Sequence, residues 1–146
     1  MDAYERAIKL LALREHTEKE IRIKLKERGF PADEIDKAID RLLEEGSLSE
    51  KRFAESYIRA RLRKNPEGRG ILRMRLIEKG SPKSVADSVL ADVWESESYI
   101  RPLAEYYESL LRKKGEEGAR AALLRKGWRE SEIKEASLFL DPGIGE

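Results

Sequence analysis

The sequence predicts an all-α protein of three tandem three-helix repeats that form an elongated molecule, either curved or straight. Apolar residues recur at helical spacing, as at Tyr4, Ala7, Ile8 and Leu11 in the first segment. Charged residues make up 40% of the 146 residues and aromatic residues only 7%, which is typical of a solvated helical protein. One pattern of glycine, leucine and arginine also recurs along the chain, which indicates repeats.

This recurrence is the main signal for the domain organisation. Gly29, Gly80 and Gly127 are separated by 51 and 47 residues, and each follows a leucine at one fixed offset and an arginine at another. A single unit of about 50 residues buries little apolar surface, so neighbouring repeats should pack against each other. The equivalent leucines are Leu25, Leu76 and Leu123, and the equivalent arginines are Arg22, Arg73 and Arg120.

The first two repeats are expected at residues 1–47 and 48–96. In the first, a helix from Asp2 to about His16 precedes a capping box formed by Thr17 and Glu20, which begins a second helix that runs to Arg28. A third helix follows Pro31 and ends before Gly46. The helices of the second repeat are expected at 50–64, from the loop 65–68 to Lys79, and from Pro82 to about Trp94.

The third repeat is expected at residues 97–141, before a frayed tail at 142–146. Pro102 predicts a break between Ser98 and Arg101, because proline is tolerated only in a first helical turn or at a kink. The following helix should end at Gly115 and the next at Gly127. A last helix is expected from Glu130 to Leu140.

Positive charge is concentrated in the second repeat. Residues 49–80 hold ten lysines and arginines against four acidic residues, although the whole chain has a net charge of only +1. A helical projection of residues 52–64 places Arg52, Arg59 and Arg63 in a stripe opposite the apolar face. Arginine suits phosphate and carboxylate recognition, so this stripe is either a binding surface or a solubilising one.

Little in the sequence points to an enzyme, a metal or a cofactor. His16 is the only histidine and cysteine is absent, so a nucleophilic triad lacks support and disulfides are excluded. No phosphate-binding or metal-binding motif occurs. The chain starts without an apolar signal segment and has no apolar run of about 18 residues, so we expect a cytoplasmic protein with no membrane span.

Motifs in all three repeats resemble those of the RecX family of bacterial recombination regulators. The central motif is the most specific, the segment from Arg14 to Leu48 resembles the first repeat of the family, and the segment from Leu111 to Ala136 resembles its third. The central motif runs through Lys51, Arg52, Phe53, Ala54, Tyr57, Arg61, Gly68, Ile71, Leu76, Lys79 and Gly80. This chain departs from the family pattern at Ser81 and in the loop Pro66–Gly70.

This resemblance implies a non-enzymatic modulator of RecA recombinase, with no cofactor. Similar proteins bind in the groove of the RecA filament on single-stranded DNA, block filament growth, and suppress ATPase activity and strand exchange. We expect a monomer that contacts the DNA directly or only through RecA. The expected contact residues are Arg52, Arg59, Arg63, Arg69, Arg73, Arg75 and Lys79, supported by Arg22 and Lys24 in the first repeat and Arg120 and Arg125 in the third.

Several of these residues also have a structural interpretation. Arg61 lies on the packing side of its helix, where pairing with a carboxylate is favoured over ligand contact. The recurrence of Arg22, Arg73 and Arg120 fits a repeated ion pair as well as a repeated contact surface. Tyr106, Tyr107 and the two tryptophans are expected to pack between helices.

Two other functions remain open from the sequence. Three-helix units also occur in helix-turn-helix proteins that act directly on DNA, although no unit here has the Asn, Gln and Arg mixture that reads bases. A generic helical-repeat adaptor is the third possibility, but the period near 50 does not match the common 34-residue type.

Overall fold

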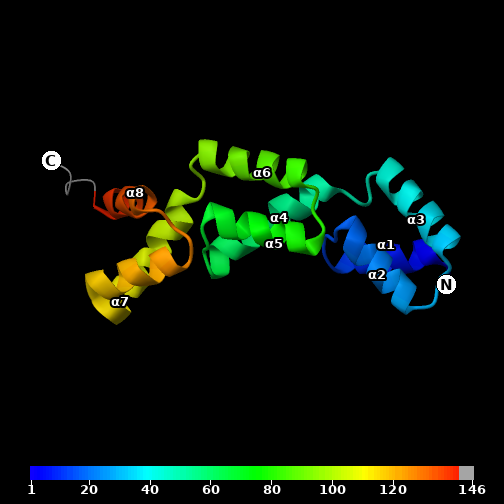
Figure 1. Ribbon diagram of the computed structural model, residues 1–146, viewed down its shortest axis with the longest axis horizontal. Coiled ribbons are helices and arrows are strands. Elements are labelled where there is room, and N and C mark those ends of the chain that lie inside the picture. The colour runs from blue at the N-terminus through cyan, green and yellow to red at the C-terminus, as the bar shows by residue number, and fades with distance from the viewer. Residues whose placement is uncertain (142–146) are drawn as a thin grey trace. The chain divides into compact units, whose positions relative to one another are not determined.

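The structure, a computed structural model, describes residues 1–141 (Figure 1). These residues form eight helices and no strand, which confirms the all-α prediction. The tail predicted at 142–146 lies outside the described residues. The helices are α1 (Ala3–Leu13), α2 (Glu18–Glu27), α3 (Ala32–Glu44), α4 (Glu50–Lys64), α5 (Arg69–Lys79), α6 (Lys83–Glu95), α7 (Ile100–Arg125) and α8 (Glu130–Leu140).

The predicted capping box begins α2. The Thr17 hydroxyl accepts a hydrogen bond from the N–H of Glu20 at 3.1 Å, and the Glu20 carboxylate accepts one from the N–H of Thr17 at 3.1 Å. Two backbone donors that the first helical turn cannot pair internally are thereby satisfied. At the other end of α2, Gly29 takes a φ of 87°, a left-handed conformation that costs other residues energy.

The first helix is shorter than predicted. We expected it to reach about His16, but α1 ends at Leu13 and Arg14 is extended, with φ −169° and ψ 168°. His16 is instead buried, and its Nδ1 lies 2.9 Å from the carbonyl oxygen of Arg14. This local hydrogen bond requires the chain to leave the helix before His16, because the imidazole must turn back toward the backbone.

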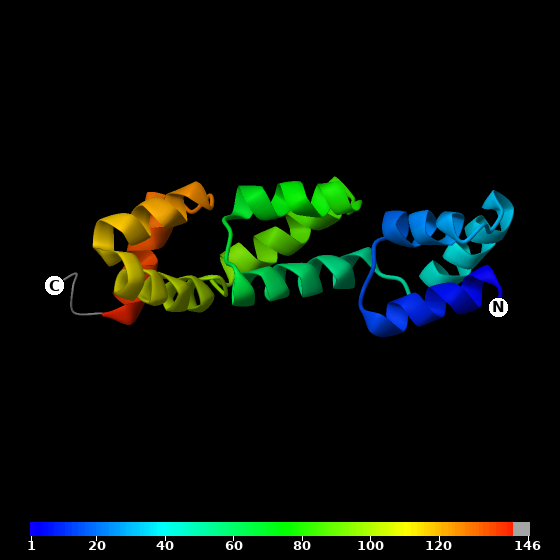
Figure 2. The ribbon, with the colours of Figure 1, turned by 90° about the horizontal axis from the view of Figure 1, so that it is seen from below.

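The sharp bend in α7 lies at Gly115, where a helix end was predicted. Gly115 has φ 76° and ψ 177°, so α7 consists of two helical arms that meet at this residue (Figure 2). Pro102 lies in the first turn of α7, after a turn at residues 96–99, so the predicted break before it is confirmed. Helix α7 packs against α8.

The chain divides into two compact units. Unit 1 comprises Met1–Tyr57 and Arg75–Asp87, and unit 2 comprises Ile58–Met74 with the described residues after Asp87. Helices α4, α5 and α6 each contribute residues to both units. The repeat boundaries expected from the sequence therefore remain a prediction, because this division passes through the proposed second repeat.

The N-terminal part of unit 1 has an apolar core between α1, α2 and α3, which lie together in Figure 1. The buried residues of α3 lie on the face that the apolar spacing predicted, and Leu48 closes the core after α3. In α1 only Ala7 of the predicted face is fully buried, because the helix turns Ala3 and Leu10 inward instead. Tyr4, Ile8, Leu11 and Phe30 pack against the edge of the core. The buried members are Ala3, Ala7, Leu10, Ile21, Leu25, Ile35, Ala38, Ile39, Leu42 and Leu48.

In unit 2 an aromatic cluster joins α6, α7 and α8. The ring centroids of Trp94 and Tyr99 are 4.9 Å apart, and Trp128 lies 6.0 Å from Trp94 and 5.9 Å from Tyr99. Trp94 donates to the buried Glu132 at 2.6 Å, and Tyr99 donates to Glu135 at 2.8 Å. The expectation that both tryptophans pack between helices is therefore confirmed.

A hydrogen bond to an equivalent backbone carbonyl occurs in both units. In unit 1 the Thr17 hydroxyl donates to the carbonyl oxygen of Lys79 at 2.6 Å. In unit 2 the N–H of Gly68 donates to the carbonyl oxygen of Lys126 at 2.8 Å. Thr17 matches Gly68, and Lys79 matches Lys126, in the alignment of the glycines. Tandem repeats would produce such a recurrence, because each would present one turn to the same loop of the preceding repeat.

Candidate functional site

The arginines expected to contact a partner differ in how the protein itself uses them. Arg59 and Arg63 are exposed, and they lie one turn apart on α4, within unit 2. Residues four apart on a helix share one face, so the two guanidinium groups point to the same side. In residues 1–141 neither side chain makes an ion pair or a hydrogen bond, so both are available to a ligand.

Three further expected residues are also exposed. The guanidinium of Arg69 lies 5.8 Å from the ring centroid of Trp94, in unit 2. The ammonium of Lys79 lies 6.0 Å from the ring centroid of Tyr57, in unit 1. Arg125 is exposed near the end of α7 and makes no ion pair within the part of the chain that the structure describes.

Arg52 has a structural role despite its exposure. Its Nε lies 3.1 Å from a carboxylate oxygen of Glu15, and its Nη2 donates to the carbonyl oxygens of Gly46 at 2.7 Å and Ser47 at 3.1 Å. These carbonyl groups follow α3, where the helix no longer supplies donors. Arg52 thus ties α4 to the turn after α3 and to the α1–α2 loop.

Arg22 and Arg120, which are equivalent in the repeat alignment, both form ion pairs. Arg22 binds Asp36 at 2.7 Å and Glu18 at 3.3 Å, and Arg120 binds Glu130 through two nitrogens. The hydrogen bond to Asp36 raises the pKa of Arg22, and that to Glu130 raises the pKa of Arg120. Both arginines thus form the ion pair that one of the two interpretations predicted, and a contact with a partner stays a prediction.

The other expected contact residues are half-buried. Lys24 donates to Nε2 of His16 at 2.9 Å. Arg73 and Arg75 each interact with another residue of the chain. These three side chains are less available to a partner than Arg59 and Arg63.

The remaining motif residues pack against other parts of the protein. Phe53 and Leu76 are buried, and Tyr57 stacks on Phe53 with ring centroids 5.7 Å apart. Arg61 binds the buried Glu67 at 2.6 Å, as the sequence favoured. Two further motif residues make close packing contacts: Ile71 packs against Gly127, and Gly80 lies close to Lys19.

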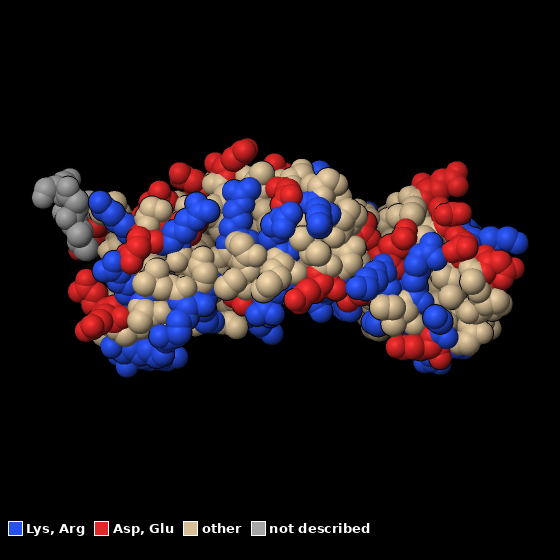
Figure 3. Space-filling model, viewed as in Figure 1, with Lys and Arg blue, Asp and Glu red and all other residues tan. Residues whose placement is uncertain are grey.

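Basic and acidic side chains are interspersed over much of the surface. On the face shown in Figure 3, Lys and Arg of the first three helices lie among Asp and Glu. This mixture makes a uniform positive band a poor description of α1 to α3. The unpaired arginines of α4 are the better candidates for a binding surface.

Sequence reasoning missed the buried polar groups. His16, Glu67 and Glu132 are all buried. Glu50, treated as one of four acidic residues in a basic stretch, also has a buried carboxylate oxygen. For His16 the only signal was its place directly before the N-cap Thr17, where a loop side chain can turn inward.

Two family models match this chain. Residues 3–42 match the first three-helix domain of RecX, and residues 49–90 match the second. The regulatory protein RecX of Chlorobium phaeobacteroides is 41% identical over 90 residues, which cover 62% of this chain and 60% of that protein. The match thus spans about three fifths of the length of that relative.

A longer match and two solved structures agree. The regulatory protein RecX of Pelodictyon phaeoclathratiforme is 30% identical over 148 residues, which cover 96% of this chain and 90% of that protein. The crystal structure of RecX from Lactobacillus salivarius shares the fold, with a TM-score of 0.76 at 22% identity, over 95% of this chain and 94% of that one. A second RecX crystal structure gives 0.75 at 25% identity, over 92% and 71%. The chain belongs to the RecX family of regulatory proteins.

Proposed function

We propose that this chain is a non-enzymatic regulator of homologous recombination and DNA repair. It binds the RecA filament on single-stranded DNA and inhibits filament extension, ATPase activity and strand exchange. Membership of a family named for a regulatory protein supports this proposal. The observation that carries it for this chain is the pair Arg59 and Arg63, which are exposed and unpaired within residues 1–141.

The chemistry of these two arginines suits such a partner. A guanidinium binds a carboxylate or a phosphate through two parallel hydrogen bonds, and both anions occur in a protein filament on DNA. Weak contacts from several helices add up when the partner is a repeating polymer. Arg69, Lys79 and Arg125 are the exposed residues that would extend the surface.

Charge reversal of the two arginines tests the proposal. The double variant Arg59→Glu/Arg63→Glu should weaken inhibition of the DNA-dependent ATPase of RecA by roughly tenfold or more, because two charge-assisted contacts become repulsive. Arg52 stays unchanged, because its hydrogen bonds to Gly46 and Ser47 would be lost with it. Far-ultraviolet circular dichroism should remain that of the wild type, since neither substituted side chain is buried.

A matched control separates this contact from a general effect of charge. Lys9→Glu/Lys37→Glu changes the net charge by the same amount at exposed positions on α1 and α3. This control should inhibit like the wild type. Full inhibition by the Arg59 and Arg63 variant, or equal loss in the control, would rule out the α4 surface.

Direct action on DNA is the alternative function. Affinity for bare single-stranded DNA, bare duplex, free RecA and RecA assembled on single-stranded DNA, each over a salt series, distinguishes the two. We expect a clear preference for the assembled filament, by a monomer in the cytoplasm. Tight binding to bare duplex that falls steeply with salt would favour a helix-turn-helix-like module instead.

A further inference from the structure

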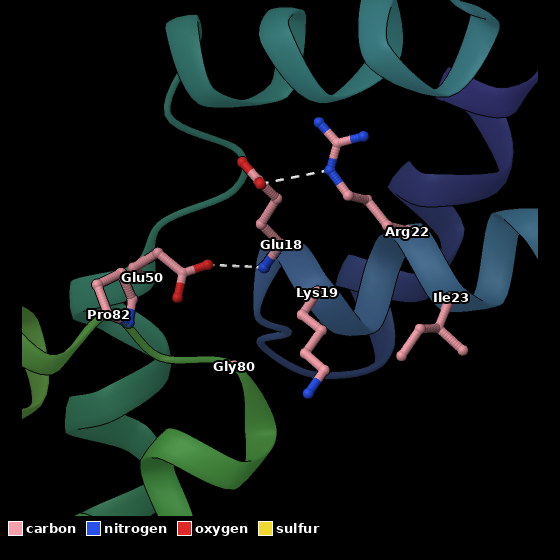
Figure 4. A pocket seen from close by; sticks show the side chains of 7 residues that line it. All are labelled: Glu18, Lys19, Arg22, Ile23, Glu50, Gly80 and Pro82. Carbon is pink, nitrogen blue, oxygen red and sulfur yellow. Dashed lines mark hydrogen bonds and ion pairs between the residues drawn. The ribbon is translucent and has the colours of Figure 1, made fainter. Parts of the chain in front are cut away.

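A pocket of about 340 Å³ lies within unit 1, beside the start of α2 (Figure 4). The first two turns of α2, the first residue of α4 and the turn between α5 and α6 surround it. Its lining includes the acidic residues Glu18 and Glu50, and Ile23 and Pro82 supply apolar surface. The pocket therefore differs in charge from the surface at Arg59 and Arg63 on α4, because its lining includes acidic and apolar residues.

The carboxylate of Glu50 is only half satisfied. Its Oε1 accepts a hydrogen bond from the N–H of Glu18 at 2.6 Å. Its Oε2 is buried and has no hydrogen-bond partner in the part of the chain that the structure describes. A buried charged oxygen without a partner is costly, so a group that binds it gains free energy.

The electrostatic surroundings of Glu50 agree with this geometry. Burial raises the pKa of Glu50, and the charges of Glu18 and Glu20 raise it further, against the hydrogen bond from the N–H of Glu18. Within the described residues, no positive side chain is among the groups that shift this pKa. The carboxylate therefore lacks the counter-charge that a folded protein normally supplies to a buried acid.

The two basic residues in the lining, Arg22 and Lys19, do not pair with Glu50. Arg22 binds Glu18 and Asp36. The side chain of Lys19 runs past Gly80, with its Cβ 2.5 Å from the position a Cβ would take there, and Figure 4 shows its ammonium pointing away from Glu50. Neither Arg22 nor Lys19 therefore occupies Oε2 of Glu50, and this oxygen is left for a cation from another molecule.

We propose that this pocket receives a lysine or arginine side chain of the partner protein. The incoming cation binds Oε2 of Glu50, the carboxylate oxygen that has no partner within the described residues. Its aliphatic stem packs on Ile23, which is 47% exposed, and on Pro82, which is also exposed. The inference rests on the proposed function, in which the partner is RecA, and it assigns this contact to protein because nucleic acids carry no such cation.

The substitution Glu50→Gln tests the pocket with little effect on folding. Glutamine keeps an amide oxygen that can accept from the N–H of Glu18, but it removes the negative charge. Affinity for RecA assembled on single-stranded DNA should fall about tenfold, as expected for loss of one charge-assisted contact. Affinity for bare single-stranded DNA should stay equal or rise, because a negative charge has been removed.

Two further variants make the result specific. Glu44→Gln removes the same charge from an exposed carboxylate of α3 and should bind the filament like the wild type. Ile23→Ala removes an apolar wall at an exposed position and should weaken filament binding without lowering the thermal midpoint. The thermal midpoint of Glu50→Gln should equal that of the wild type or exceed it, because a buried charge without a partner is removed.

Each outcome decides between the two proposals. If the wild type binds the filament and Glu50→Gln binds it equally well, the pocket inference is wrong and the proposed function stands. A Glu50→Gln protein with a lowered thermal midpoint, or with equally weakened binding to bare DNA, would show that Glu50 only caps α2. If the wild type ignores the filament, the proposed function fails, and the inference fails with it.

Discussion

At the scale of single residues, nearby carboxylates decide what each arginine does. Arg61 lies beside the buried Glu67 and holds a loop in place, whereas Arg59, two positions earlier on the same helix, is exposed and unpaired within residues 1–141. The helical projection separated these two faces correctly. It could not show that Arg52 binds Glu15, because that partner is 37 residues away in the sequence.

His16 makes the stability of unit 1 depend on pH. Its Nδ1–H donates to the carbonyl oxygen of Arg14 and its Nε2 accepts from Lys24, so the ring is neutral in the folded protein. Burial lowers the pKa of His16 below its usual 6.5, and the charges of Arg14 and Lys24 lower it further. The unfolded chain therefore binds a proton more readily than the folded one, and the stabilising contribution is present above pH 6.5 and lost as pH falls below it.

We therefore expect the wild type to lose stability relative to His16→Gln as pH falls. Urea unfolding of both proteins between pH 8 and pH 5 measures this difference, and the carboxylates they share cancel in the comparison. Because His16 is the only histidine, its pKa can also be followed directly by NMR. A pKa at or above 6.5, or a difference in stability that does not change with pH, would contradict this prediction.

At the scale of helices and turns, the sequence was most informative where a local rule determines the conformation. The capping box at Thr17 and the glycine after α2 depend on residues a few positions apart, and both were predicted. The end of α1 was predicted wrongly, because the burial of His16 is a tertiary effect. Helical spacing alone does not reveal which loop side chain turns inward.

Gly68 is required by a close approach between two backbone segments. A Cβ at Gly68 would lie 2.1 Å from the carbonyl oxygen of Gly127 and 2.4 Å from its carbon. Gly68→Ala should destabilise unit 2 by about 1–3 kcal/mol, because backbone atoms cannot move aside as a flexible side chain can. Urea unfolding monitored by tryptophan fluorescence measures this, since Trp94 and Trp128 both lie in unit 2.

Gly70 provides the matched control for this substitution. It lies two residues away in α5, and a Cβ there would have no neighbour within 4 Å. Gly70→Ala should leave the stability unchanged or raise it by about 0.5–1 kcal/mol, because alanine favours a helix over glycine. If the Gly68→Ala protein is as stable as the Gly70→Ala protein, the backbone segments at Gly68 and Gly127 can move apart without a loss of stability.

At the scale of the whole molecule, the sequence predicted the class of fold and the family, but only part of the candidate site. The repeated glycines and the RecX motifs depend on positions along one chain, so they can be read from it. The pocket at Glu50 cannot, because Glu18 and Pro82 join it from positions 32 residues away on either side. The buried, unpaired oxygen of Glu50 appears only when these segments are folded together.

The two units share three helices, and this sharing should make their unfolding cooperative. Since α4, α5 and α6 each supply residues to both units, unfolding of unit 1 leaves unit 2 with shortened helices. Thr17→Ala removes from unit 1 an N-cap worth about 1 kcal/mol and the hydrogen bond to Lys79. We expect it to lower the unfolding midpoint seen by tryptophan fluorescence, although both tryptophans lie in unit 2.

The control for this coupling is the midpoint seen by circular dichroism, which reports helices in both units. In a cooperative molecule the fluorescence and circular dichroism midpoints of Thr17→Ala coincide and fall together. An unchanged fluorescence midpoint beside a two-step circular dichroism curve would contradict the prediction. In that case α4, α5 and α6 would each unfold over the residues that belong to unit 1 and stay helical over those that belong to unit 2.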